Sequence, residues 1–177
     1  LFTGFIPPLS QNDWTHYFGL YKEIPEFKLQ NYNMSMQEFK IIFWWEWAHR
    51  QLGRLIGLTV LLPMIYFTIK NGFWILREYS IIFFFLCFQG FIGWYMVSSG
   101  LVDRVDVSHY RLSLHLVTAF IILSLVFWKY LNLTDLKINR INIKLNLIKF
   151  FLLLLFLQLI IGAFVSGMDA GKIYNSW

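Results

Sequence analysis

The chain alternates between polar stretches and four long runs of apolar residues, at about 40–69, 80–99, 111–131 and 146–167. Each run has roughly the 20 residues that an α-helix needs to cross the hydrocarbon core of a bilayer. A helix over the first run would measure roughly 43 Å at 1.5 Å per residue, so we expect its first turns to protrude or the helix to tilt. The pattern predicts an all-α, multi-pass transmembrane helix bundle.

The polar stretches between the runs predict how the chain is organised. Residues 1–38, rich in proline and aromatic residues, are expected to form an outer loop on the periplasmic or intermembrane-space side. Residues 39–133 would hold three membrane helices, 134–145 a basic inner loop, and 146–177 a further helix and the start of another outer loop. Both ends look cut, so we expect an internal piece of a larger membrane protein.

The basic residues set the expected orientation. The stretch 129–149 carries one acidic residue, Asp135, and five basic residues, which are Lys129, Lys137, Arg140, Lys144 and Lys149. The positive-inside rule places such a loop on the cytoplasmic or matrix side. Because successive helices alternate in direction, the N-terminal segment, the 100–110 loop and the C-terminus are then expected on the outer side.

Composition supports a membrane protein and disfavours several other classes. Hydrophobic residues make up 58% of the chain and charged residues 14%, which is unusual for a soluble domain. The net charge of +5 does not indicate nucleic-acid binding, because the basic residues concentrate in one short loop. Cys87 is the single cysteine, which excludes an internal disulfide. No glycine-rich phosphate loop, serine nucleophile arrangement or cysteine zinc motif is present.

Ionisable side chains gather at the head of the first apolar run, in the sequence Glu46-Trp-Ala-His49-Arg50-Gln-Leu-Gly53-Arg54. Such groups are costly at membrane depth, where they usually face a protein interior and mark function. On a helix, Glu46 and His49 share a face, as do Arg50 and Arg54, and Gly53 follows one turn beyond His49. This segment is the strongest candidate for a functional site.

A second histidine, His115, follows Arg111 at the i+4 spacing in the third run. Counted from the inner ends of their helices, His49 lies roughly 30 Å and His115 roughly 20–27 Å above the inner surface, a difference that helix tilt can absorb. Two imidazoles at similar depth on separate helices can bind the two faces of a heme iron. Arg50, Arg54 and Arg111 would then pair with the heme propionates.

Each of these residues also has a simpler interpretation. A histidine in a membrane helix can serve as a hydrogen-bonding link between helices. Glu46 is expected to orient His49 or to act as an acid or base, but it can equally form a salt bridge to Arg50. Gly53 and Gly57 leave room for a flat ring, or for close helix packing.

Other residues are expected to be structural. His16 and His109 are interpreted as solvated or structural residues in outer loops. Gly90 and Gly93 allow the same two interpretations as the glycines of the first run. A weak internal repeat is also present: a glutamine precedes a glycine by four residues at Gln89–Gly93 and again at Gln158–Gly162. The repeat suggests a duplicated helix pair.

Several segments resemble heme A synthase of the mitochondrial and alphaproteobacterial type. They run nearly end to end: Ile6-Pro-Pro with Asp13-Trp14, Pro25-Glu-Phe-Lys28, Glu38-Phe-Lys40, Glu46-x-x-His49-Arg50-x-x-Gly53-Arg54-x-x-Gly57, Phe88-Gln-Gly-Phe-Ile-Gly-Trp-Tyr-Met-Val-x-Ser99-Gly-Leu101, Ser108-x-Tyr-Arg-Leu-x-x-His115-Leu and Gly162-Ala-Phe-Val-x-Gly167-x-Asp169-Ala-Gly-x-x-Tyr174-Asn-Ser.

The resemblance implies an eight-helix protein of two pseudo-symmetric four-helix halves, each holding a heme between two histidines. This chain would contain the second to fifth helices, with residues 39–133 as the heme-binding helices of the N-terminal half. His49 and His115 match the iron ligands for the substrate, heme O, and Glu46 matches an acid implicated in activity. The reaction would oxidise a porphyrin ring methyl to a formyl group, which gives heme A for cytochrome oxidase. The heme b cofactor belongs to the C-terminal half, whose histidine pair has no counterpart here.

The resemblance also implies a membrane heme oxidoreductase in a bacterial or mitochondrial inner membrane, with a heme O-producing farnesyltransferase and a second copy of itself as partners. This portion alone is not expected to be active. Two alternatives stay open from the residues themselves: a bis-histidine cytochrome b that only carries electrons, and a heme chaperone or assembly factor without chemistry.

Overall fold

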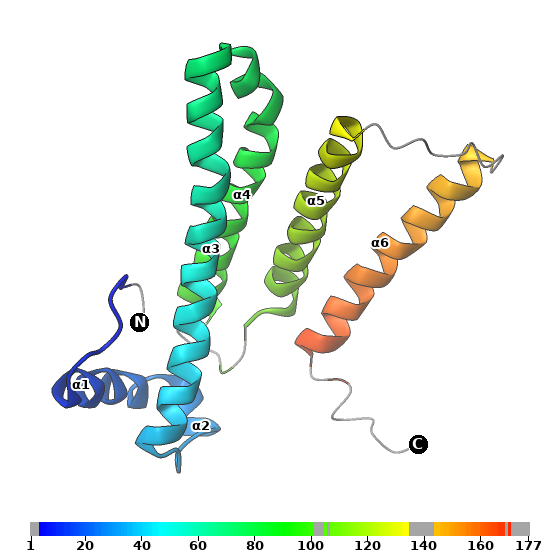
Figure 1. Ribbon diagram of the computed structural model, residues 1–177. Helices are drawn as coiled ribbons and strands as arrows, with labels where there is room; N and C mark the ends of the chain where they lie inside the picture. Colours follow the sequence, from blue (N-terminus) through cyan, green and yellow to red (C-terminus); the bar gives the residue numbers. More distant parts are fainter. Residues whose placement is uncertain (1–3, 101–104, 106, 135–143, 169, 171–177) are drawn as a thin grey trace. The chain divides into compact units, whose positions relative to one another are not determined.

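The computed structural model consists of helices joined by short connections. It describes residues 4–100, 105, 107–134, 144–168 and 170. Its helices are α1 (Gln11–Lys22), α2 (Pro25–Leu29), α3 (Met36–Asn71), α4 (Trp74–Gly100), α5 (His109–Leu133) and α6 (Leu145–Gly167) (Figure 1). No strand occurs among these described residues, which confirms the predicted all-α class.

Four of the helices, α3 to α6, are long and apolar enough to cross a membrane, in agreement with the four predicted spans. The central part of the predicted basic loop, residues 135–143, and the C-terminal residues 171–177 lie outside the described residues. The loop assignments and the orientation therefore stay predictions.

Helix α3 begins before its apolar run because Ser35 and Glu38 form a capping box at its first turn. The Glu38 carboxylate accepts a hydrogen bond from the Ser35 backbone N–H at 2.7 Å, and the Ser35 hydroxyl accepts one from the Glu38 N–H at 3.4 Å. The helix ends at Gly72, whose φ of 102° suits glycine. With 36 residues, α3 is about 54 Å long, which exceeds the roughly 30 Å hydrocarbon core of a bilayer.

The chain divides into two compact units, residues 1–83 with 97–106 and residues 84–96 with 107–177. In the first unit, α1 and α2 lie beside the first turns of α3 (Figure 1). The expected outer loop thus contains two helices. We call this region the aromatic cap, after its buried residues Trp14, Phe18, Tyr21, Phe39 and Phe43.

Helical spacing explains why the aromatic cap forms. Trp14, Phe18 and Tyr21 recur at i, i+4 and i+7, so they make one apolar stripe on α1. Phe39 is completely buried, and its ring centroid lies 5.1 Å from that of Phe18 and 5.2 Å from that of Tyr21. The cap therefore attaches the polar N-terminal segment to α3 through aromatic packing.

Tyr21 also carries the polar contact of the cap. Its hydroxyl donates to Glu26 Oε1 at 3.0 Å and accepts from the Asn31 side-chain amide at 2.9 Å. The pKa of Tyr21 is raised to about 12, mainly by burial and also by the neighbouring Glu26 carboxylate. The hydrogen bond from Asn31 acts in the opposite direction and lowers this pKa. The neutral phenol is thus the form that the fold stabilises.

This pKa predicts that the cap weakens in strong alkali. The unfolded chain releases the Tyr21 proton near pH 10 and the folded chain near pH 12. The stabilisation is therefore fully present below pH 10 and is lost as the pH rises towards 12. The ultraviolet absorbance of tyrosinate, measured as a function of pH, checks this. When the titration curve of Tyr21→Phe is subtracted from that of the wild type, the difference should correspond to one tyrosine with a midpoint near pH 12. A midpoint near 10 would contradict the prediction.

In the second unit, α5 and α6 lie closest where α5 begins and α6 ends (Figure 1). A Cβ added to Gly167 would lie 2.8 Å from the His109 Cβ and 2.9 Å from its Cα. The Phe164 ring packs at 5.8 Å from the His109 ring and at 5.4 Å from the Tyr110 ring. His109 is the first residue of α5 and His16 lies on α1, so both have helical rather than loop conformation. His16 is exposed, as the prediction of a solvated residue requires.

Gly167→Ala should therefore destabilise the contact between α5 and α6, because the obstacle is backbone that cannot rotate away. We expect a loss of about 1–3 kcal/mol, the usual cost of overpacking. Gly162→Ala on the same helix is the control, since a Cβ there meets nothing within 4 Å. Thermal unfolding of the full-length protein in detergent measures both variants, and equal midpoints would refute the close contact.

Candidate functional site

The candidate residues of α3 lie in its N-terminal half and at its middle, on one surface. Glu46, His49, Gly53 and Gly57 follow one another at spacings of three and four residues within the continuous helix, so they share a face. The His49 side chain is exposed. A Cβ added at Gly53 or at Gly57 would meet nothing within 4 Å in the described part of the chain. Among those residues, nothing covers the α3 face beside His49, so it could receive a flat group.

Glu46 forms an ion pair with Arg50, which is the simpler of the roles predicted for it. The Nη2 of Arg50, one turn further along α3, donates to Glu46 Oε1. The two side chains are partly exposed, at 31% for Glu46 and 23% for Arg50. The pair is accessible from outside the helix, so a ligand that approaches this face of α3 can reach either partner.

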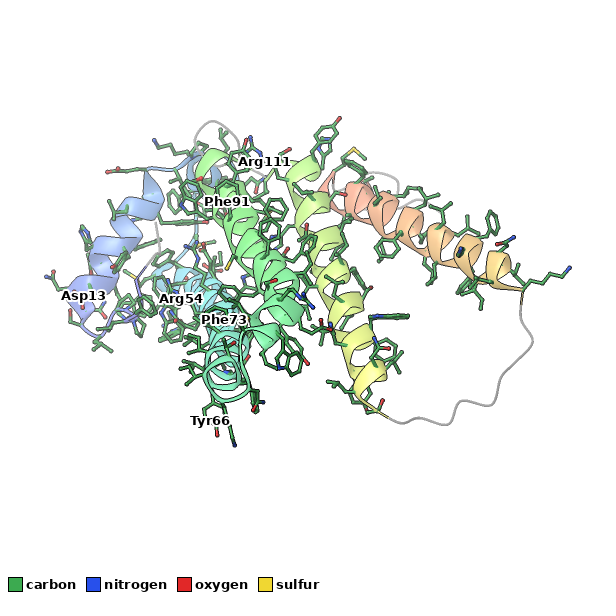
Figure 2. The ribbon with its side chains drawn as sticks, turned by 90° about the horizontal axis from the view of Figure 1, so that it is seen from above. Asp13, Arg54, Tyr66, Phe73, Phe91 and Arg111 are labelled. Atoms are coloured by element: carbon green, nitrogen blue, oxygen red, sulfur yellow. The ribbon has the colours of Figure 1, made fainter. Side chains whose placement is uncertain are left out.

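Arg54 is in contact with the N-terminal segment of its own unit. Figure 2 labels Arg54 on α3. Its Nη1 donates to the Gly4 carbonyl at 3.4 Å, and its guanidinium lies 4.0 Å from the centre of the Phe5 ring. Gln51 donates to the same carbonyl at 3.4 Å. Stacking on an aromatic ring restricts the orientation of the Arg54 guanidinium.

In the second unit, His115 on α5 lies against α4. Gln89 Nε2 donates to the His115 backbone carbonyl at 3.0 Å. A Cβ added to Gly93 would lie 3.1 Å from the His115 Cε1. Arg111, labelled in Figure 2, lies one turn before His115. It stacks on Tyr95, with 4.7 Å between the guanidinium carbon and the ring centre. Both α5 candidates thus have defined neighbours on α4.

The candidates fall into two groups. The first group lies on α3 in the first unit and consists of Glu46, His49, Arg50, Gly53, Arg54 and Gly57. The second group lies on α5 in the second unit and consists of Arg111 and His115. The pairing of His49 with His115 stays a prediction. Sequence reasoning missed Gln89, Tyr95 and Phe5 as neighbours of the candidates. For Gln89, the sequence offers one indication, its spacing of four residues from Gly93, which by itself indicates only an internal repeat.

The fold and these residues define a multi-pass helical membrane protein with histidine, arginine and carboxylate side chains on its membrane helices. The chain belongs to the COX15-CtaA family of cytochrome oxidase assembly proteins, whose family model matches residues 1–177. This match confirms the resemblance predicted from the motifs.

Curated relatives named heme A synthase match the chain over nearly its whole length. It is 51% identical to the protein of Pelagibacter ubique, over 100% of this chain and 53% of the relative. It is 47% identical to that of Maricaulis maris and 44% identical to that of Parvibaculum lavamentivorans, each over 99% of this chain and 52% of the relative. The chain thus spans about half the length of the curated relatives it matches. No solved structure matches it significantly.

Proposed function

We propose that this chain is the substrate-binding part of a heme A synthase, which oxidises a ring methyl of heme O to a formyl group and so supplies heme A for cytochrome oxidase. The observation that carries the proposal is the match of the whole chain, at 44–51% identity, to proteins named heme A synthase. The placement of histidine beside an open glycine face on α3 supports the same assignment.

His49 and His115 are the proposed ligands of the substrate iron. A neutral imidazole is a strong axial ligand for heme iron, and two of them give a six-coordinate, low-spin centre. Gly53 and Gly57 fit this role because the porphyrin plane needs a helix surface without side chains next to the ligand. The fit rests on residues of each unit taken separately.

Arg50, Arg54 and Arg111 are the proposed partners of the propionates. A guanidinium binds a carboxylate through paired N–H groups, which fixes orientation as well as charge. Arg50 can transfer from Glu46 to a propionate at small cost, because their pair is partly exposed. Arg54 and Arg111 are held on the aromatic rings of Phe5 and Tyr95.

Glu46 is the proposed proton acceptor. Conversion of a methyl to a formyl group, formally R–CH3 + H2O → R–CHO + 4 H⁺ + 4 e⁻, releases four protons, while the four electrons pass to an acceptor outside this chain. A carboxylate near the ligand histidine therefore has a direct use as a proton acceptor. Glu46 lies three residues before His49, on the same face of α3. When Arg50 binds a propionate, the Glu46 carboxylate is released for this task.

The partners follow from the same proposal. A farnesyltransferase that makes heme O would deliver the substrate, and a second copy of the protein would form a homo-oligomer in the bilayer. The relatives named above are bacterial, which favours the bacterial inner membrane over the mitochondrial one. Heme b would serve as the cofactor of the other half of the protein.

The test is chemical extraction of the porphyrins from the full-length protein, purified from cells that make heme O. We expect heme O together with its hydroxylated or formyl derivatives. The same protein from cells without the farnesyltransferase should contain neither. If protein from heme O-producing cells contains only heme b, the protein is an electron carrier and the proposal is wrong.

A further inference from the structure

Two residues of α4 contact His115 in two different places. Gln89 Nε2 donates to its backbone carbonyl at 3.0 Å, across 26 residues of sequence. Gly93, one turn further along α4, faces its ring: an added Cβ would lie 3.1 Å from Cε1, 3.7 Å from Nδ1 and 3.9 Å from Nε2. All three residues belong to one compact unit. The backbone and the imidazole of His115 are thus each set by a separate neighbour.

The contact at Gly93 depends on the lack of a side chain. A separation of 3.1 Å is tighter than ordinary van der Waals contact, so alanine at this position would push the ring aside. Gly90, one turn earlier on α4, has nothing within 4 Å of an added Cβ. The two glycines therefore differ: Gly93 admits the imidazole, whereas Gly90 faces open space.

Gln89 has an unused acceptor next to this contact. Its Oε1 is buried and has no hydrogen-bond partner in the described part of the chain. An unsatisfied buried amide oxygen destabilises the fold, and leucine at this position would avoid that penalty. Because Oε1 belongs to the same amide as Nε2, it lies beside His115. A buried polar atom of this kind needs an explanation beyond packing.

We propose that Gln89 and Gly93 are positioning residues for His115. Gly93 leaves space for the imidazole, and Gln89 anchors the His115 backbone through Nε2. Gln89 Oε1 makes no hydrogen bond within the described residues of this structure; in the iron-bound state it would accept the Nδ1–H of the ring while the ring Nε2 binds iron. Metal-binding histidines usually donate their second N–H to such an acceptor, which fixes the tautomer and raises ligand basicity. This inference rests on the proposed function, since it takes His115 as an iron ligand.

The experiment uses the full-length protein and its low-spin heme signal in electron paramagnetic resonance. His115→Ala first defines the part of the signal that depends on His115. In Gln89→Leu and in Gly93→Ala we expect that part to shift or to fall, and the affinity for added heme to drop roughly 10- to 100-fold. Added imidazole should restore the low-spin signal in both variants. Gly90→Ala is the matched control and should keep the wild-type signal.

The outcomes separate the two proposals. If His115→Ala leaves the signal unchanged, the proposed function fails. If His115→Ala removes it but Gln89→Leu and Gly93→Ala keep the wild-type signal and affinity, only the positioning role fails. Should Gln89→Leu not fold, Gln89→Glu takes its place, because it keeps an oxygen at the same reach. A reduction potential lower than that of wild type is expected there, and an unchanged potential overturns the role of Oε1.

Discussion

Replacement of His49 by alanine should remove one low-spin heme from the full-length protein and bring heme A formation below detection. The imidazole is the only iron ligand that the open face of α3 offers in this proposal, so the heme loses one of its two axial bonds. Loss of a hydrogen-bonding partner to a ligand costs roughly 10- to 100-fold in metal affinity, and loss of the ligand itself should cost more. Optical spectroscopy should show conversion of low-spin to high-spin heme.

His49→Ala should change heme binding without disturbing the fold. The His49 side chain is exposed and makes no hydrogen bond within the described part of the chain, so alanine removes little packing. The thermal midpoint of heme-free His49→Ala should therefore stay close to that of heme-free wild type, whereas bound heme would itself raise the midpoint of the wild type. His16→Ala on α1 is the matched control, because it removes a histidine from the same unit, outside the α3 face. An unchanged low-spin content in His49→Ala would exclude the residue as a ligand.

The membrane helices could be predicted because their apolar runs are long, but their ends could not. The first run predicts a start near residue 40, whereas α3 begins at Met36, where the capping box satisfies the first N–H groups. The second run predicts a start near 80, whereas α4 begins at Trp74 and includes Arg77 and Glu78. Hydropathy reports the part of a helix that suits lipid, while backbone hydrogen bonding extends the helix into polar residues.

The site could be predicted within one helix, but not between helices. The shared face of Glu46 and His49 follows from 3.6 residues per turn, as does the ion pair of Glu46 with Arg50. The contact of Arg54 with Phe5 joins segments about fifty residues apart and depends on how the N-terminal segment packs on α3. Such contacts are set by tertiary packing, which no local spacing encodes.

Glu46→Gln is expected to leave the substrate heme bound and to stop its oxidation. Glutamine keeps the length of the side chain and one acceptor oxygen but cannot take up a proton at neutral pH. Loss of a positioned acid or base typically costs 10²- to 10⁴-fold in rate, so heme A should fall at least about 100-fold while heme O accumulates. Porphyrin extraction and mass spectrometry of the purified full-length variant measure both species.

Glutamine keeps the length of the side chain and can still accept a hydrogen bond from Arg50, so the fold should tolerate this change. Glu23→Gln, at the exposed C-terminal end of α1, is the control and should form heme A normally. The same variant separates a synthase from a bis-histidine electron carrier. A carrier needs its two axial imidazoles but no proton acceptor beside the ring, so Glu46→Gln would leave electron transfer intact. Wild-type heme A formation in Glu46→Gln would show that this carboxylate serves the ion pair and takes no part in the reaction.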